Sequence, residues 1–243
     1  MEKNIIYGIR AVIEAIEGGR SIDKILVRQN LQGDLAKELM ALIQRNNLTF
    51  QKVPVERIDR VTRNNHQGVV AYISPVEYRP FEKVLKEALN KNKSPFFLIL
   101  DGITDVRNFG AIARTAECGG VDAIILPEKG SVSVTADAIK TSAGALFRVP
   151  VCREKNLYYV LRHFKDLDFT IAAASEKGGD DFRQVDYSGP VALVMGAEDK
   201  GVSGQLLKLA DARISIPVVG DIGSLNVSVA AGVLIYEVLR DKQ

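Results

Sequence analysis

The fold of this chain is decided by two neighbouring stretches, VMGAEDKGV at residues 194–202 and RISIPVVGDIGSLNVSVA at residues 213–230. The first carries an apolar run into a Gly-Ala-Glu (196–198), and the second leads through a Ser-Leu-Asn (224–226) into an apolar helix. Glycine lets a ligand come close to the backbone, and a Ser-Leu-Asn at a helix start offers a hydroxyl, an amide and free N–H groups. Polar groups gathered where two apolar strands end predict a binding site rather than part of the core.

Apolar runs of strand length alternate with helical patterns from Phe96 onward. We predict strands at 96–100, 123–126, 147–151, 169–173, 191–195 and 214–217, and helices at 109–118, 134–146, 157–165 and 227–240. Continuous apolar strands between helices are typical of an α/β fold whose mostly parallel sheet is covered on both faces.

A smaller α/β pattern precedes it. We predict helices at 4–18, 35–45 and 54–61, and strands at 22–27, 49–53 and 69–73. The Lys-rich stretch 75–94, with a helix at 81–89, indicates an interdomain linker. The predicted domains are therefore 1–74 and 95–243, joined by that linker.

Composition narrows the function classes. The net charge is only +2, but residues 1–94 hold 16 Lys and Arg against 11 Asp and Glu, whereas residues 95–243 hold 16 against 19. This distribution favours a polyanionic partner for the N-terminal part. Residues 1–20 lack the apolar segment of a signal peptide, and no run approaches the ~18 apolar residues of a membrane helix.

The cysteines and histidines argue against metal and hydrolase chemistry. Cys118 and Cys152 lack metal-ligand spacing, so we expect reduced structural thiols in a cytoplasmic protein. With only His66 and His163, a zinc site or a Ser-His-Asp triad is not expected. No metal is predicted.

A further polar loop, DGITDVRNFGAIARTAECGG at 101–120, follows the first buried strand of the larger domain. Asn108 suits the strand-to-helix turn, and Arg114 lies on the helix that follows, where an inward guanidinium would need an anion. Neither a G-x-G-x-x-G fingerprint nor a Walker lysine motif is present. The common nucleotide-binding folds are therefore not favoured.

These stretches resemble three ordered motifs of the SpoU (TrmH-like) family of RNA 2'-O-ribose methyltransferases. The motifs fall at 101–120, 193–202 and 214–237, and TSAGALFRVPV at 141–151 is also similar to the family. The resemblance implies a SPOUT-type α/β domain with a deep trefoil knot over 95–243. It also implies an obligate homodimer that uses S-adenosylmethionine.

The resemblance also implies a role for each motif residue. The implied cofactor contacts, mainly through the backbone, are Gly196, Ile216 and Leu225, with Met195, Ala197, Gly201 and Pro217 beside them. Arg114 is the implied general base for the ribose 2'-hydroxyl, a role that needs activation because a free guanidinium has a pKa above ~12. The side chains implied to orient Arg114 and the ribose are Asn108, Glu198, Ser224 and Asn226.

The N-terminal YGIRAVIEAI (7–16) and HQGVVA (66–71) resemble the small RNA-binding domain of one subgroup, which is similar to a ribosomal-protein fold. That subgroup methylates a guanosine of large-subunit (23S) ribosomal RNA. The expected RNA contacts are His66, Arg63 and Arg107, the last standing where many relatives carry a proline and a histidine before the asparagine. Two alternatives stay open: a tRNA guanosine 2'-O-methyltransferase, and a non-catalytic RNA-binding ribosome-assembly factor.

Overall fold

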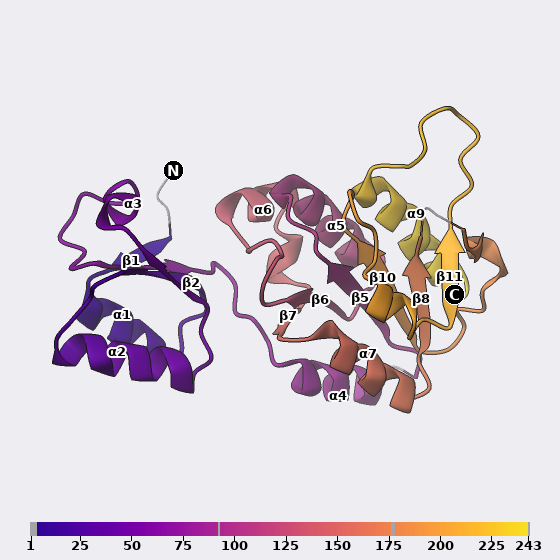
Figure 1. Ribbon diagram of the computed structural model, residues 1–243. Helices are drawn as coiled ribbons and strands as arrows, with labels where there is room; N and C mark the ends of the chain where they lie inside the picture. The colour runs from indigo at the N-terminus through magenta and orange to yellow at the C-terminus, as the bar shows by residue number, and fades with distance from the viewer. Residues whose placement is uncertain (1–3, 92, 176–177, 243) are drawn as a thin grey trace. The chain divides into compact units, whose positions relative to one another are not determined.

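The computed structural model describes residues 4–91, 93–175 and 178–242. The chain divides into two units, Met1–Glu77 and Tyr78–Gln243, and each has its own sheet (Figure 1).

The first unit is a four-stranded mixed sheet with helices on both faces. Its elements are β1 (Ile5–Tyr7), α1 (Ile9–Glu17), β2 (Ile22–Arg28), α2 (Asp34–Arg45), β3 (Phe50–Val53), α3 (Val55–Asp59) and β4 (Val69–Ile73). The strand order is β1-β4-β2-β3, with β4 antiparallel to both neighbours and β2 parallel to β3. Ile13 of α1 and Leu39 of α2 pack on one face of the sheet, and Ile58 of α3 packs in a separate cluster with Leu26 and Val70.

The helix predicted over residues 4–18 is wrong at its start. Ile5–Tyr7 is a strand that pairs antiparallel with β4, and α1 begins only at Ile9. Gly8 lies between the strand and the helix with a φ of 93°, a backbone conformation that residues with a side chain rarely adopt. Ile5 and Ile6 pack in opposite clusters, which is the two-residue period of a strand.

The second unit is a seven-stranded parallel sheet with helices on both faces, which confirms the predicted α/β fold. Its helices are α4 (Phe81–Lys91), α5 (Val106–Cys118), α6 (Ala136–Thr141), η1 (Ala145–Phe147), α7 (Leu157–Asp166), η2 (Phe182–Gln184), α8 (Gly204–Leu207) and α9 (Val227–Arg240). Its strands are β5 (Phe96–Asp101), β6 (Ala123–Pro127), β7 (Val151–Glu154), β8 (Thr170–Ala174), β9 (Asp180–Asp181), β10 (Val191–Gly196) and β11 (Ala212–Ser215). Figure 1 shows α4 and α7 on one side of the sheet and α5, α6 and α9 on the other.

The predicted linker 75–94 differs from the structure. Phe81, Val84 and Leu85 of α4 are buried in the core of the second unit, and the Phe81 ring centroid lies 5.3 Å from that of Phe164 in α7. The second unit therefore begins at Tyr78. The lysines that suggested a linker lie on the solvated side of an amphipathic helix.

The predicted helix 134–146 and strand 147–151 are also corrected. Ala143 and Gly144 have φ angles of 50° and 84°, which separate α6 from η1 and delay β7 until Val151. Left-handed backbone cannot continue a right-handed helix. The other predicted strands of this unit agree with the structure to within one or two residues.

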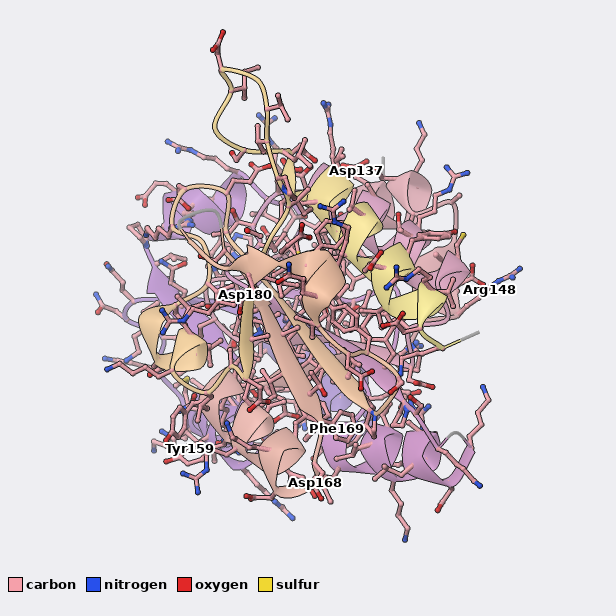
Figure 2. All side chains as sticks on the ribbon, turned by 90° about the vertical axis from the view of Figure 1, so that its right-hand side faces the viewer. Asp137, Arg148, Tyr159, Asp168, Phe169 and Asp180 are labelled. Atoms are coloured by element: carbon pink, nitrogen blue, oxygen red, sulfur yellow. The ribbon has the colours of Figure 1, made fainter. Side chains whose placement is uncertain are left out.

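The order of the strands places the polar loops together. The sheet runs β7-β6-β5-β10-β8-β11-β9, so β10 lies between β5 and β8, which come earlier in the chain. In parallel sheets, ligands bind at the carboxyl ends of strands where the order reverses. In Figure 2, Phe169 marks the amino end of β8 and Asp180 lies toward the opposite end of the sheet. The trefoil knot stays a prediction.

Candidate active site

A cavity of about 500 Å³ lies at the carboxyl ends of β8, β10 and β11. That volume suits a small-molecule ligand. All seven residues predicted to contact a cofactor line it: Met195, Gly196, Ala197, Gly201, Ile216, Pro217 and Leu225. Glu198, Ser224 and Asn226 line it as well, as do the apolar side chains of Ile214 and Leu234. The structure therefore brings both motif-bearing loops to one site.

Gly196 is required by the shape of the loop that follows β10. A Cβ at this position would lie 2.0 Å from the carbonyl carbon of Gly201 and 2.1 Å from the nitrogen of Val202. The Gly201 N–H donates to the Ala197 carbonyl at 2.8 Å, and the Ser203 N–H donates to Asp101 Oδ2 at 2.8 Å. The loop thus closes tightly upon the end of β10 and gives the cavity a wall of backbone.

Asn108, Glu198 and Asn226 form a hydrogen-bonded group beside the cavity, called here the amide–carboxylate cluster. Glu198 Oε1 accepts from Asn108 Nδ2 at 2.8 Å and from Asn226 Nδ2 at 2.9 Å. Asn226 Nδ2 also donates to Asn108 Oδ1 at 3.1 Å. Hydrogen bonds from amide groups to a carboxylate are stronger than those between neutral groups, so they hold the Glu198 side chain in place.

Helix caps hold two members of this cluster. Asp105 Oδ1 accepts from the Asn108 N–H at 2.8 Å and caps α5, which places Asn108 in the first turn. Asn226 caps α9, because its Oδ1 accepts from the Ser228 N–H at 3.0 Å. The Ser228 hydroxyl donates to the same Oδ1 at 2.6 Å.

Arg114 is not brought into the cavity of a single chain. It is exposed on α5 and lies outside the described lining residues. Six residues separate it from Asn108, which corresponds to ~9 Å along a helix axis and a different face. Arg107, seven residues before Arg114, is also exposed and shares its helical face.

His66 of the first unit is held by hydrogen bonds within its own loop and to α3. Its Nδ1 accepts from the Gly68 N–H at 2.9 Å, and its Nε2 lies 2.8 Å from Asp59 Oδ1. Both ring nitrogens are engaged within the protein, so His66 holds the loop, and its contact with RNA stays a prediction. Arg63, in the same loop, is exposed as a phosphate contact requires.

Sequence reasoning missed two other residues that shape this loop. Gln67 Oε1 accepts from the Ile9 N–H at 3.1 Å at the start of α1, and Asn64 Nδ2 donates to the Tyr7 hydroxyl at 3.0 Å. These bonds span about sixty residues of sequence, so no local pattern indicates them. They tie the loop after α3 to the start of α1.

The described residues contain neither a cluster of metal-ligating side chains nor a membrane-spanning helix. Within residues 4–91, 93–175 and 178–242, the structure contains no group of three His, Cys, Asp or Glu side chains arranged to hold a metal ion. The helices in these same ranges are all too short or too polar to cross a membrane. Cys118 is exposed, and burial raises the pKa of the Cys152 thiol to about 12.

Two family models match the chain, one over most of each unit. Residues 95–236 match the SpoU rRNA Methylase family, and residues 5–79 match the model described as RNA 2'-O ribose methyltransferase substrate binding.

Similar proteins and superposed crystal structures indicate the same family as these two models. A protein of Staphylococcus saprophyticus named as a TrmH family tRNA/rRNA methyltransferase is 38% identical over 242 residues, covering 100% of this chain and 97% of the relative. The AdoMet-bound rRNA methyltransferase of Sinorhizobium meliloti superposes with a TM-score of 0.61 at 27% identity, over 97% of this chain and 86% of that one. The A. aeolicus TrmH/SpoU tRNA modifying enzyme superposes with a TM-score of 0.55 at 32% identity, over 66% of this chain and 83% of that one. The chain therefore belongs to the SpoU (TrmH) family of S-adenosylmethionine-dependent RNA 2'-O-methyltransferases.

Proposed function

We propose that this protein methylates the ribose 2'-oxygen of a guanosine in large-subunit (23S) ribosomal RNA, in the cytoplasm. The observation that carries the catalytic part is the amide–carboxylate cluster at the mouth of a ligand-sized cavity. The cluster unites the first turn of α5, the loop after β10 and the N-cap of α9 beside that cavity. A pure RNA-binding protein has no need of such an arrangement, which disfavours the ribosome-assembly alternative.

The cavity suits S-adenosylmethionine. Its walls offer backbone at Gly196 and Ala197 on one side and at Ile216 and Leu225 on the other, with apolar side chains beneath. Backbone donors and acceptors between apolar surfaces are what an adenosine requires, since it presents a flat ring with a polar edge. The bound cofactor supplies a methyl group on a sulfonium. The residues of this chain hold that group close to the ribose and exclude water.

The amide–carboxylate cluster would orient the ribose. Oε1 of Glu198 already accepts hydrogen bonds from two side-chain amides. The second carboxylate oxygen, Oε2, is therefore the one that remains for a ribose hydroxyl. Ser224 lines the cavity nearby and adds a hydroxyl. Holding the nucleophile in line with the transferred group supplies a large part of the rate enhancement of such a reaction.

We propose that Arg114 acts, together with an RNA phosphate, as the general base that accepts the proton of the ribose 2'-hydroxyl. A guanidinium acts as a base only where its environment disfavours the charged form, because its pKa is otherwise above ~12. Its position outside the cavity of one chain favours a site completed by the partner protomer.

A second copy of the chain is proposed to pack on α9. This helix exposes Val229, Val233 and Tyr236, which recur at a spacing of four and three residues on one face. Thr115, next to Arg114, lies against Gly232 of α9, so a partner on this face would adjoin Arg114. Val233→Glu should convert a dimer to a 26.6 kDa monomer in light scattering. A wild-type protein that is already monomeric would contradict the proposal.

Ribosomal RNA is favoured over tRNA by the extent of the structural match. The S. meliloti rRNA enzyme aligns with 97% of this chain, whereas the A. aeolicus tRNA enzyme aligns with 66%. The substrate-binding model at residues 5–79 also gives the first unit an RNA-binding role. The trefoil knot implied by the family remains part of this proposal.

The decisive experiment compares ribosomal RNA and tRNA from a strain lacking the protein with wild type by mass spectrometry. One 2'-O-methylguanosine should disappear from 23S RNA and return with the wild-type gene. Arg114→Ala should fail to restore it while retaining cofactor binding by calorimetry, and Arg162→Ala, an exposed arginine on α7, should restore it fully. Loss of a tRNA methyl group instead would establish the tRNA alternative, and full activity of Arg114→Ala would remove its assigned role.

A further inference from the structure

The orientation of the Asn226 side-chain amide determines which hydrogen bonds form within the amide–carboxylate cluster. As it lies, both hydrogens of Nδ2 are used, one toward Glu198 Oε1 and one toward Asn108 Oδ1. A rotation of the amide by 180° would bring its oxygen against these two oxygens, with no hydrogen between them. Only one of the two orientations therefore supports the cluster.

Ser228 favours that orientation with two donors. Its backbone N–H and its hydroxyl both donate to Asn226 Oδ1, at 3.0 Å and 2.6 Å. In the rotated amide, an NH₂ group would face the Ser228 N–H, and donor would oppose donor. The hydroxyl bond is the shorter of the two and lies within the normal range for O–H···O bonds.

We propose that Ser228 is a positioning residue of the methyl transfer reaction, acting through Asn226 on Glu198 and Asn108. Ser228 is not among the described residues that line the cavity, so its effect on the reaction would pass through Asn226. Its hydroxyl sets which atoms of Asn226 face the carboxylate, and so fixes where Glu198 holds the substrate. This inference rests on the proposed function of the cluster.

The test is a pair of substitutions at one position. Ser228→Ala removes the hydroxyl but keeps the N–H bond, so kcat should fall by about two- to tenfold, the factor that one neutral hydrogen bond contributes. The affinity for S-adenosylmethionine, measured by calorimetry, should not change. Ser228→Thr keeps a hydroxyl and should recover most of the rate. Arg162→Ala, at an exposed arginine on α7, is the control and should behave as wild type.

A spectroscopic measurement separates this inference from the proposed function. The side-chain NH₂ resonances of Asn226 in ¹⁵N NMR spectra should shift and broaden in Ser228→Ala and return in Ser228→Thr. These resonances can be followed even if no RNA substrate is methylated, an outcome that would refute the proposed function alone. Unchanged resonances with an unchanged kcat would overturn the positioning role. A Ser228→Ala protein that loses cofactor affinity or melting temperature in proportion to its activity would overturn it too, since the residue would then be merely structural.

Discussion

Replacing Gly196 by alanine should damage both stability and cofactor binding. The added Cβ would meet the Gly201 carbonyl carbon at 2.0 Å and the Val202 nitrogen at 2.1 Å, whereas ordinary contacts begin near 3.4 Å. Both neighbours are backbone atoms, so no side chain can rotate away. The loop after β10 must therefore move by more than 1 Å, which strains the Gly201–Ala197 hydrogen bond.

The expected magnitude follows from these contacts. Forcing extra atoms into a packed site costs about 1–3 kcal/mol, and loss of one backbone hydrogen bond adds about 1 kcal/mol. A total of about 2–4 kcal/mol is less than the usual stability of a domain, so the variant should fold. For a unit of this size, the melting temperature should fall by roughly 5–15 °C.

Two measurements check this prediction. Scanning calorimetry gives the melting temperature, and titration with S-adenosylmethionine gives the affinity, which should fall because the displaced loop is a wall of the cavity. Gly204→Ala is the control, since a Cβ there meets nothing within 4 Å. A Gly196→Ala protein with the melting temperature and affinity of Gly204→Ala would refute the reasoning.

Three further predictions concern groups outside the cavity. His66→Ala should loosen the loop at 62–68 and weaken RNA binding in filter assays while leaving cofactor affinity unchanged, because both ring nitrogens hold that loop; unaltered RNA binding would contradict this role. In the native protein Ellman's reagent should label Cys118 alone, since Cys152 is fully buried and burial raises its pKa to about 12; rapid labelling of two thiols would be inconsistent with that burial. Burial lowers the pKa of Lys242 from 10.5 to about 8, so between these values the unfolded chain binds the extra proton, and the stability that this group contributes rises with pH. Urea unfolding at pH 8 and pH 10 should therefore show wild type gaining stability relative to Lys242→Met, and a constant difference would rule the effect out.

The parallel sheet could be predicted because its strands are continuous apolar runs. Residues 96–100 and 191–195 are buried, and short apolar runs between helices are typical of a parallel sheet covered on both faces. The predictions for residues 4–18 and 75–94 are wrong where one sequence pattern fits two kinds of structure. Apolar residues at 5 and 9 fit a helix, yet they lie on either side of Gly8. The segment of α4 resembles a linker in sequence because charged residues alternate with its buried apolar ones.

The site could be predicted only as a set of residue types. Local sequence placed polar side chains after strands, and the family resemblance named them, but Asn108 and Glu198 are ninety residues apart. They meet because β10 inserts beside β5 rather than at an edge of the sheet. The position of β10 in the sheet depends on the packing of the whole unit, so a short stretch of sequence does not predict it. The same holds for His66, whose ring partners depend on how the loop after α3 folds back.

The hydrogen bonds of the amide–carboxylate cluster also explain how an enzyme that binds RNA can carry a carboxylate beside its cavity. RNA brings a phosphate to every nucleotide, so an unpaired carboxylate at the mouth of the cavity would repel its substrate. Glu198 is instead held by two amide N–H groups, and Asn226 links it to the start of α9, where the helix dipole is positive. Asn226→Asp would replace that donor with a second carboxylate about 3 Å from Glu198, a distance at which two such groups cannot both stay ionised. The two asparagines therefore do what aspartates could not: their N–H groups fix the Glu198 carboxylate in place and offset part of its negative charge.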